Sequence, residues 1–122
     1  MAIFLSDEWV GLVDEALRAI PAPTIPMTAG SVEYRVGDRA YHLTLGADGV
    51  HARCGPAPCP TVVFVQSRAT AAAIGRGERS GQGAVQAGDV VVHGDPTILL
   101  IWRLALVEAD AALSHLATFT SY

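Results

Sequence analysis

The first helix of the chain is predicted by apolar residues that recur every three or four positions, the spacing of one face of an amphipathic helix. These residues are Trp9, Val13, Ala16, Leu17 and Ile20. Ser6 precedes them, and its hydroxyl can accept a hydrogen bond from a free backbone N–H of the first turn. We therefore expect a helix that begins after Ser6 and ends before Pro21, followed by an extended connector in the Pro-rich residues 21–26.

Alternation of apolar and polar residues then predicts a three-stranded antiparallel meander. Residues 30–36 and 39–45 flank Gly37-Asp38, a two-residue hairpin turn in which glycine can take a positive φ. A second turn at residues 46–49 returns the chain, and both registers place the same side chains on one face: Val32, Tyr34, Tyr41, Leu43, Leu45, Val50, Ala52 and Cys54. The opposite face carries Glu33, Arg35, His42, Thr44, His51 and Arg53. We expect this polar face to lie in solvent.

The segment after the meander predicts two more strands, separated by two short helices. Residues 60–66 are apolar on both sides, so this strand should lie inside the sheet or be covered on both faces. Ser67 is placed to cap a helix over residues 68–74. A second helix over residues 78–87 contains two glycines, each of which costs about 1 kcal/mol relative to alanine. Residues 89–93 form the fifth strand.

A long apolar helix is predicted after Asp95 and Pro96, which suit the N-cap and the first helical position. On a helical wheel most of its apolar side chains form one wide arc. This arc contains Ile98, Leu99, Ile101, Trp102, Ala105, Leu106, Ala109 and Leu113. Two polar stripes separate it from a narrower ridge of Leu100, Leu104 and Val107. Since one core face needs only the wide arc, the ridge indicates a further partner, either a second copy of the chain in a homodimer or a transient contact with a membrane.

The composition indicates one domain, residues 1–122, with more apolar residues than its core needs. Hydrophobic residues make up 51% of the chain and charged residues 16%, and the mean hydropathy is +0.35. Small domains have a large surface relative to their volume. The apolar surplus is therefore expected either in an interface or around an internal cavity, and composition leaves both open.

Charge and the opening residues disfavour other classes of partner. The formal net charge is −4, and all eight basic residues are arginines scattered along the chain. Nucleic acid is not expected as a partner, because phosphate neutralisation needs a concentrated basic surface. The first residues lack the basic start and apolar run of a signal peptide, and no apolar stretch is long enough to span a membrane. We expect a cytoplasmic protein.

The sequence shows no arrangement typical of an enzyme or a metal site. The glycines of residues 75–83 fit neither a phosphate-binding loop nor a dinucleotide fingerprint. Cys54 and Cys59 offer two thiols where a structural zinc needs four ligands, and they are expected to be reduced. The polar face of the meander carries two histidines, but Arg53 beside them would repel a cation. We therefore expect neither catalysis nor a cofactor.

Residues 69–95 resemble the signature of the sterol carrier protein 2 family of nonspecific lipid-transfer domains. The matching positions are Ala73, Ile74, Gly77, Glu78, Ser80, Ala84, Gly88, Val90, Val92, Gly94 and Asp95. Residues 4–9 (FLSDEW) and the final helix are also similar to small stand-alone bacterial members, so the resemblance covers nearly the whole chain. It implies an α+β fold, with a five-stranded, mostly antiparallel sheet and helices packed over one face.

The same resemblance implies a hydrophobic ligand in a cavity between the sheet and the helices. Small residues would leave volume there, and branched or aromatic residues would form the walls. The candidate lining residues are Phe64, Ala71, Ile74, Val85, Val90, Val92, Ile98, Trp102 and Leu106. A fatty acyl chain, an acyl-CoA or a sterol is the implied ligand, which the protein would bind or transfer. One alternative stays open: these residues form an ordinary core, and the protein is an interaction or dimerisation module with the same fold and no lipid ligand.

Overall fold

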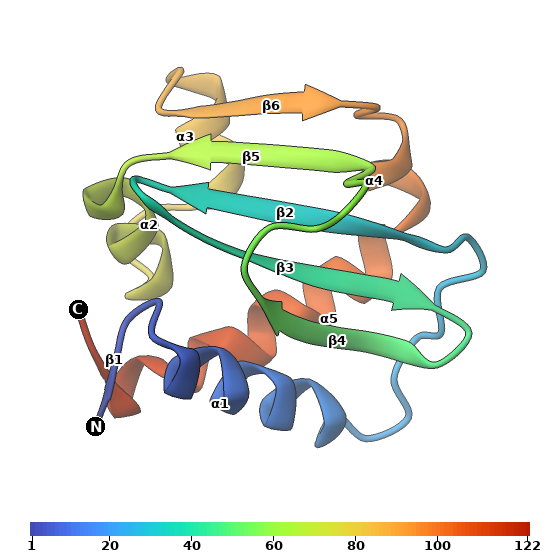
Figure 1. Ribbon diagram of the computed structural model, residues 1–122, viewed down its shortest axis with the longest axis horizontal. Helices are drawn as coiled ribbons and strands as arrows, with labels where there is room; N and C mark the ends of the chain where they lie inside the picture. The colour runs from blue at the N-terminus through green and yellow to red at the C-terminus, as the bar shows by residue number, and fades with distance from the viewer.

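The computed structural model describes residues 1–122 and contains a five-stranded sheet with the helices on one side (Figure 1). From one edge to the other, the strands are β4 (Gly49–Cys54), β3 (Arg39–Gly46), β2 (Gly30–Val36), β5 (Val62–Gln66) and β6 (Val90–Gly94). The helices are α1 (Asp7–Arg18), α2 (Arg68–Gly75), α3 (Gly81–Gln86), α4 (Ile98–Ile101) and α5 (Arg103–Ser114). Near the chain ends, β1 (Ala2–Ile3) pairs with β7 (Thr120–Ser121), which follows a 3-10 turn at Ala117–Phe119. The predicted α+β class is confirmed.

The predicted hairpins form in the predicted registers. β2 pairs with β3 so that Tyr34 lies opposite Tyr41, and β3 pairs with β4 so that Leu43 lies opposite Ala52. Gly37 adopts a φ of +60° at the first turn, a conformation that costs glycine little because it has no Cβ. Local turn chemistry and alternation therefore determine this half of the sheet.

β5 lies inside the sheet, as its apolar sequence predicts, but it runs parallel to β2. The other pairings are antiparallel, so the sheet is mixed. Because β4 is an edge strand and β5 lies beyond β2, residues 55–61 must cross the face of the sheet that the helices leave open. Figure 1 shows this crossover passing in front of β3 and β2.

The crossover corrects, for Glu33 and His42, the expectation that the polar face of the meander lies in solvent, whereas Arg35 and Arg53 are exposed as expected. Glu33 is 1% exposed and His42 is 8% exposed. Glu33 Oε1 accepts a hydrogen bond from the Ala57 N–H at 2.9 Å, and His42 Nδ1 lies 2.9 Å from the Gly55 carbonyl oxygen. Arg35 pairs with the second carboxylate oxygen of Glu33, so the buried charge has a partner. Alternation shows which residues share a face, but it does not show what covers that face.

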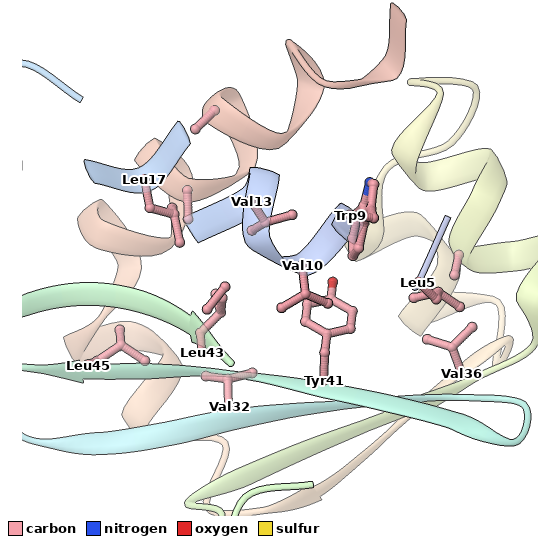
Figure 2. Close-up of a cluster of buried hydrophobic side chains, with 14 of the residues drawn as sticks. Leu5, Trp9, Val10, Val13, Leu17, Val32, Val36, Tyr41, Leu43 and Leu45 are labelled. Carbon is pink, nitrogen blue, oxygen red and sulfur yellow. The ribbon is translucent and has the colours of Figure 1, made fainter. Parts of the chain in front are cut away.

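The opposite face of the sheet forms the main core with α1 (Figure 2). Figure 2 shows Trp9 and Val13 of α1 above Val32 and Leu43 of the sheet, and all four side chains are buried. The helix begins where predicted, because Ser6 Oγ accepts a hydrogen bond from the Trp9 N–H at 3.2 Å. Fully burying one such apolar side chain contributes about 1.5–3 kcal/mol. The β3–β4 half of the sheet is therefore firmly held.

The final helix differs from the single predicted one because it breaks at Trp102. α4 ends at Ile101 and α5 starts at Arg103, while Trp102 takes a φ of −91° and a ψ of 7°. The indole Nε1–H donates to the Thr28 carbonyl oxygen at 2.8 Å, and the side chain is 1% exposed. Ile101, at one end of the predicted arc, is exposed, whereas Ile98, Trp102, Ala105 and Ala109 within the arc are buried.

Two further helix boundaries also differ from the prediction. α3 covers six residues rather than ten, because its glycines favour helix poorly. Asp95 Oδ1 accepts a hydrogen bond from the Thr97 N–H at 3.0 Å, and it stabilises the turn that precedes α4 instead of capping a helix that starts at Pro96. None of the helices combines the length and the apolar character that crossing a bilayer requires.

α1 also covers the edge strand β4, through Asp14. Its Oδ1 accepts a hydrogen bond from the Ala52 N–H at 3.0 Å, so this backbone group of the edge strand is not free to pair with another chain. Arg18 lies 2.7 Å from Oδ2, and His51 Nδ1 lies 3.5 Å from Oδ1. Burial acts to raise the pKa of Asp14, but the Ala52 hydrogen bond and the charges of Arg18 and His51 outweigh it and lower the pKa from its ordinary value.

Asp14→Ala is expected to destabilise the domain by about 1–3 kcal/mol, because the Ala52 N–H then remains buried without a partner. Asp14→Asn keeps an oxygen acceptor and is the matched control, with a smaller loss. Since the folded-state pKa is lowered, the contribution of the carboxylate is present above the ordinary Asp pKa of about 4 and is lost as the pH falls through the folded value. Chemical denaturation from about pH 2 to pH 7 measures both effects. Equal stability of Asp14→Ala and the wild type at neutral pH would show that the edge contact is unimportant.

Candidate functional site

The candidate site is built on two neighbouring rows of side chains on the helix-covered face of the sheet. The pairing registers place Tyr41, Tyr34, Phe64 and Val92 side by side, one from each of four adjacent strands. The Tyr34 ring centroid lies 4.8 Å from that of Tyr41 and 5.5 Å from that of Phe64, and both ring pairs are stacked. The next row on this face, two positions along each strand, consists of Val36, Gln66 and Val90.

Two adjoining hollows lie over these rows. The first, the sheet-edge hollow, has a volume of about 400 Å³ and lies over β5 and β6. Its lining comprises Tyr34, Phe64, Gln66, Ile74, Gly81, Gln82, Val85, Val90, Val92, Leu99, Leu106 and Asp110. The second, the aromatic hollow, has a volume of about 330 Å³ and reaches Phe4, Trp9, Tyr41 and Tyr122. The residues common to both are Tyr34, Gln66, Ile74, Gly81 and Asp110.

The hollows remain open because the cover over this half of the sheet is short and made of small residues. α1 packs on the β4 side of the sheet, away from β5 and β6. Besides Leu99, Leu106 and Asp110 of α4 and α5, the cover here comes from α3, which is six residues long and contains two glycines, and from α2, whose sequence RATAAAIG is mostly alanine. Side chains of this size cannot fill the space between helix and sheet to the density of a normal core.

Six of the nine predicted lining residues meet at the sheet-edge hollow: Phe64, Ile74, Val85, Val90, Val92 and Leu106. Ala71 lines the aromatic hollow. Ile98 and Trp102 line neither hollow and belong to the main core. The Trp102 ring packs so closely on Gly30 that a Cβ there would come within 2.8 Å of it. A helical wheel does not separate the part of an apolar arc that meets solid core from the part that meets a hollow.

The polar and aromatic lining residues that were not identified as site residues from the sequence include Tyr34, Tyr41, Gln66 and Asp110. Alternation places both tyrosines on the inner face of the meander, but only the pairing of β2 with β5 brings Tyr34 beside Phe64. Asp110 belongs to a polar stripe of the final helix. No sequence signal shows that this stripe faces a hollow.

Asp110 is the only acidic residue in either lining. Its carboxylate takes part in no ion pair. Asp110 is an exposed residue, but the protein atoms around its carboxylate remove part of its hydration and raise its pKa. Burial also raises the pKa of Tyr34 and of Tyr41, and the nearby charge of Asp110 adds to both shifts. Arg79, the one cation in the linings, belongs to the aromatic hollow and pairs with Asp89 at 2.9 Å.

The hollows bring unpaired polar atoms together with apolar side chains. Gln66 Oε1 and Trp9 Nε1 are buried without a hydrogen-bond partner, and both residues line the aromatic hollow. No three His, Cys, Asp or Glu side chains are grouped so that they could hold a metal ion. Cys54 and Cys59 are unpaired, exposed and outside both linings. What the site combines is apolar area, unpaired polar atoms and one negative charge.

Solved structures of sterol carrier proteins share this fold. A crystal structure of sterol carrier protein 2 matches with a TM-score of 0.70 and 17% sequence identity, covering 91% of this chain and 97% of that chain. A possible sterol carrier protein of Thermus thermophilus matches with a TM-score of 0.69 and 17% identity, covering 93% of this chain and 90% of that one. Palmitated sterol carrier protein 2 like 2 from Aedes aegypti matches with a TM-score of 0.63 and 17% identity, covering 84% and 94%.

The chain therefore has the sterol carrier protein 2 fold, which its sequence resemblance predicted. No protein-family profile matches the sequence, and no curated protein is significantly similar to it.

Proposed function

We propose that this protein binds and releases one hydrophobic ligand, a fatty acyl chain, an acyl-CoA or a sterol, in the two adjoining hollows. The convergence of six predicted lining residues on the sheet-edge hollow carries this proposal. The volumes of about 400 Å³ and 330 Å³ fall in the range of small-molecule sites. The Aedes aegypti protein with this fold is palmitated, which supports an acyl chain as one ligand class.

The lining also supports an affinity suited to release. Burying about 15 methylene groups of a sixteen-carbon chain contributes roughly 12 kcal/mol. Association and ordering of the chain offset at least about 4 kcal/mol of this. At most about 8 kcal/mol then remains, which corresponds to a micromolar or weaker dissociation constant and lets a carrier exchange its ligand.

Val92→Phe is expected to weaken lipid binding at least about tenfold, because the added ring carbons occupy part of the sheet-edge hollow. Val91, the next residue, is exposed and points to the opposite face of β6. Val91→Phe is therefore the matched control and should bind as the wild type does. Partition of radiolabelled hexadecanoate, 1-hexadecanol and cholesterol between delipidated protein and a hydrophobic resin measures the affinity of the wild type and of both variants for each lipid. If no probe binds the wild type at tens of micromolar, or if both variants behave alike, the proposed site is wrong.

Trp9 should report a bound ligand through its fluorescence, because it lines the aromatic hollow, whereas Trp102 lines neither hollow. Trp9→Phe is expected to remove most of the ligand-induced change in emission. Trp102→Phe should retain that change, although it loses the hydrogen bond to Thr28. The reverse result would place the ligand against Trp102, in the region that the structure fills with core.

A second proposal concerns the exposed apolar ridge of α4 and α5, which would contact a second copy of the chain or, transiently, a membrane surface. Leu100, Leu104 and Val107 are 76%, 67% and 59% exposed. Isolated apolar side chains on a surface are ordinary, but a contiguous apolar ridge is typical of a contact site. This observation favours the interaction-module alternative for this face, and it is compatible with a ligand in the hollows.

Leu104→Glu should leave the melting temperature within about 2 °C of the wild-type value, because an exposed side chain contributes little to folding. The same variant should abolish any dimer seen by analytical ultracentrifugation and any binding to neutral phosphatidylcholine vesicles. Ala47→Glu adds the same charge at the exposed turn between β3 and β4 and is the matched control. A wild-type protein that is monomeric and does not bind vesicles would rule out both roles for the ridge.

A further inference from the structure

Asp110 is the feature of the hollows that apolar packing does not explain. The geometry points to Asp110 as the residue that selects the head group of the ligand. The hollows take a lipid whose head group donates hydrogen bonds and carries no negative charge, an alcohol or an amine, in preference to a fatty-acid anion. This inference rests on the proposed function, because it concerns the same hollows.

The position of Asp110 places it beside the head of a bound lipid. It lines both hollows, together with Tyr34 and Gln66. The sheet-edge hollow has a mostly apolar lining, to which Phe64 and Leu106 belong. An acyl tail is accommodated best against that apolar lining, so its polar end lies toward the region that the two hollows share.

The charges of the linings disfavour an anionic head in that region. The sheet-edge hollow contains no cation, and Asp110 is its only charged residue. In the aromatic hollow Arg79 is the only cation, and its guanidinium is engaged by Asp89 at 2.9 Å. The charge of Asp110 is therefore not compensated locally, and a carboxylate brought close to it would be repelled in a partly desolvated setting.

A hydrogen-bond donor would instead supply what Asp110 lacks. Its carboxylate oxygens are acceptors only when ionised, and no protein side chain donates to them as an ion-pair partner. Asp110 is exposed, and the protein atoms around its carboxylate raise its pKa by removing part of its hydration, as expected for a carboxylate without a charged partner. A hydroxyl or ammonium head restores that missing donor, and a hydroxyl can also accept a hydrogen bond from a neighbouring tyrosine.

Three probes of equal chain length separate the head group from the tail: 1-hexadecanol, hexadecylamine and hexadecanoate. Their affinities for delipidated wild type and Asp110→Asn are measured at about pH 8 by partition against a hydrophobic resin. The wild type should bind the alcohol at least about tenfold more tightly than hexadecanoate. Asp110→Asn should raise the affinity for hexadecanoate about tenfold and change that for the alcohol less than about threefold. A wild-type preference for the amine that disappears in Asp110→Asn identifies a cationic head, and a preference for the alcohol identifies a neutral one.

The matched control is Asp38→Asn, which makes the same change at the turn between β2 and β3, outside both linings. It should reproduce all three wild-type affinities. Asp110→Asn removes a partly desolvated charge, so its melting temperature should be no lower than that of the wild type. If this variant fails to fold, the relative affinities of the wild type for the three probes still test the inference. Tighter binding of hexadecanoate than of either other probe overturns it.

The failure of this inference is distinguishable from failure of the proposed function. Equal wild-type affinities for the three probes, or ratios that Asp110→Asn leaves unchanged, overturn the role of Asp110 and leave lipid binding in place. If none of the three probes binds, both proposals are overturned.

Discussion

The parallel pairing of β2 with β5 is the constraint on which the other features of this structure depend. It requires residues 55–61 to cross the face of the sheet that the helices leave open, where their backbone groups form hydrogen bonds with Glu33 and His42. It also carries the chain to the far side of β2, so that β5 and β6 extend the sheet beyond the part covered by α1. The hollows lie between this extension and the helices that cover it, of which α2 and α3 are short.

The two halves of the domain consequently differ in packing. Under α1, Val13 and Val32 are completely buried, and the edge of the sheet is closed by the bond from Ala52 to Asp14. Over β5 and β6, Phe64 and Val92 are only partly buried and line a hollow of about 400 Å³. Under the proposed function this division is useful, because a ligand can be exchanged over one half while the contacts that contribute most to stability remain intact in the other.

Features determined by neighbours in the sequence were predictable. The hairpin registers follow from alternation and from Gly37, and the start of the first helix follows from Ser6. Features determined by contacts with distant segments were not predictable from the sequence. The burial of Glu33 depends on the crossover, and the break at Trp102 accompanies a hydrogen bond to Thr28, 74 positions earlier.

The candidate site also has a part that was predictable from the sequence and a part that was not. Most of its apolar wall could be predicted, because small and branched residues are frequent in the segments that resemble sterol carrier proteins. Its polar groups could not, because a helical wheel assigns Asp110 to a surface stripe and does not show that the helix presents this stripe to a hollow. An apolar pocket and an apolar core also have the same composition, so only the three-dimensional arrangement separates Val92 in the lining from Ile98 in the core.

The central claim, that a lipid occupies the adjoining hollows, is tested most directly by an NMR titration of delipidated, ¹⁵N-labelled protein with 1-hexadecanol. The largest chemical-shift changes are expected at the amides of Phe64, Val85 and Val92, with little change at Leu43 in the main core. Changes centred on Leu104 at the exposed ridge, or no changes at saturating ligand, would contradict the claim.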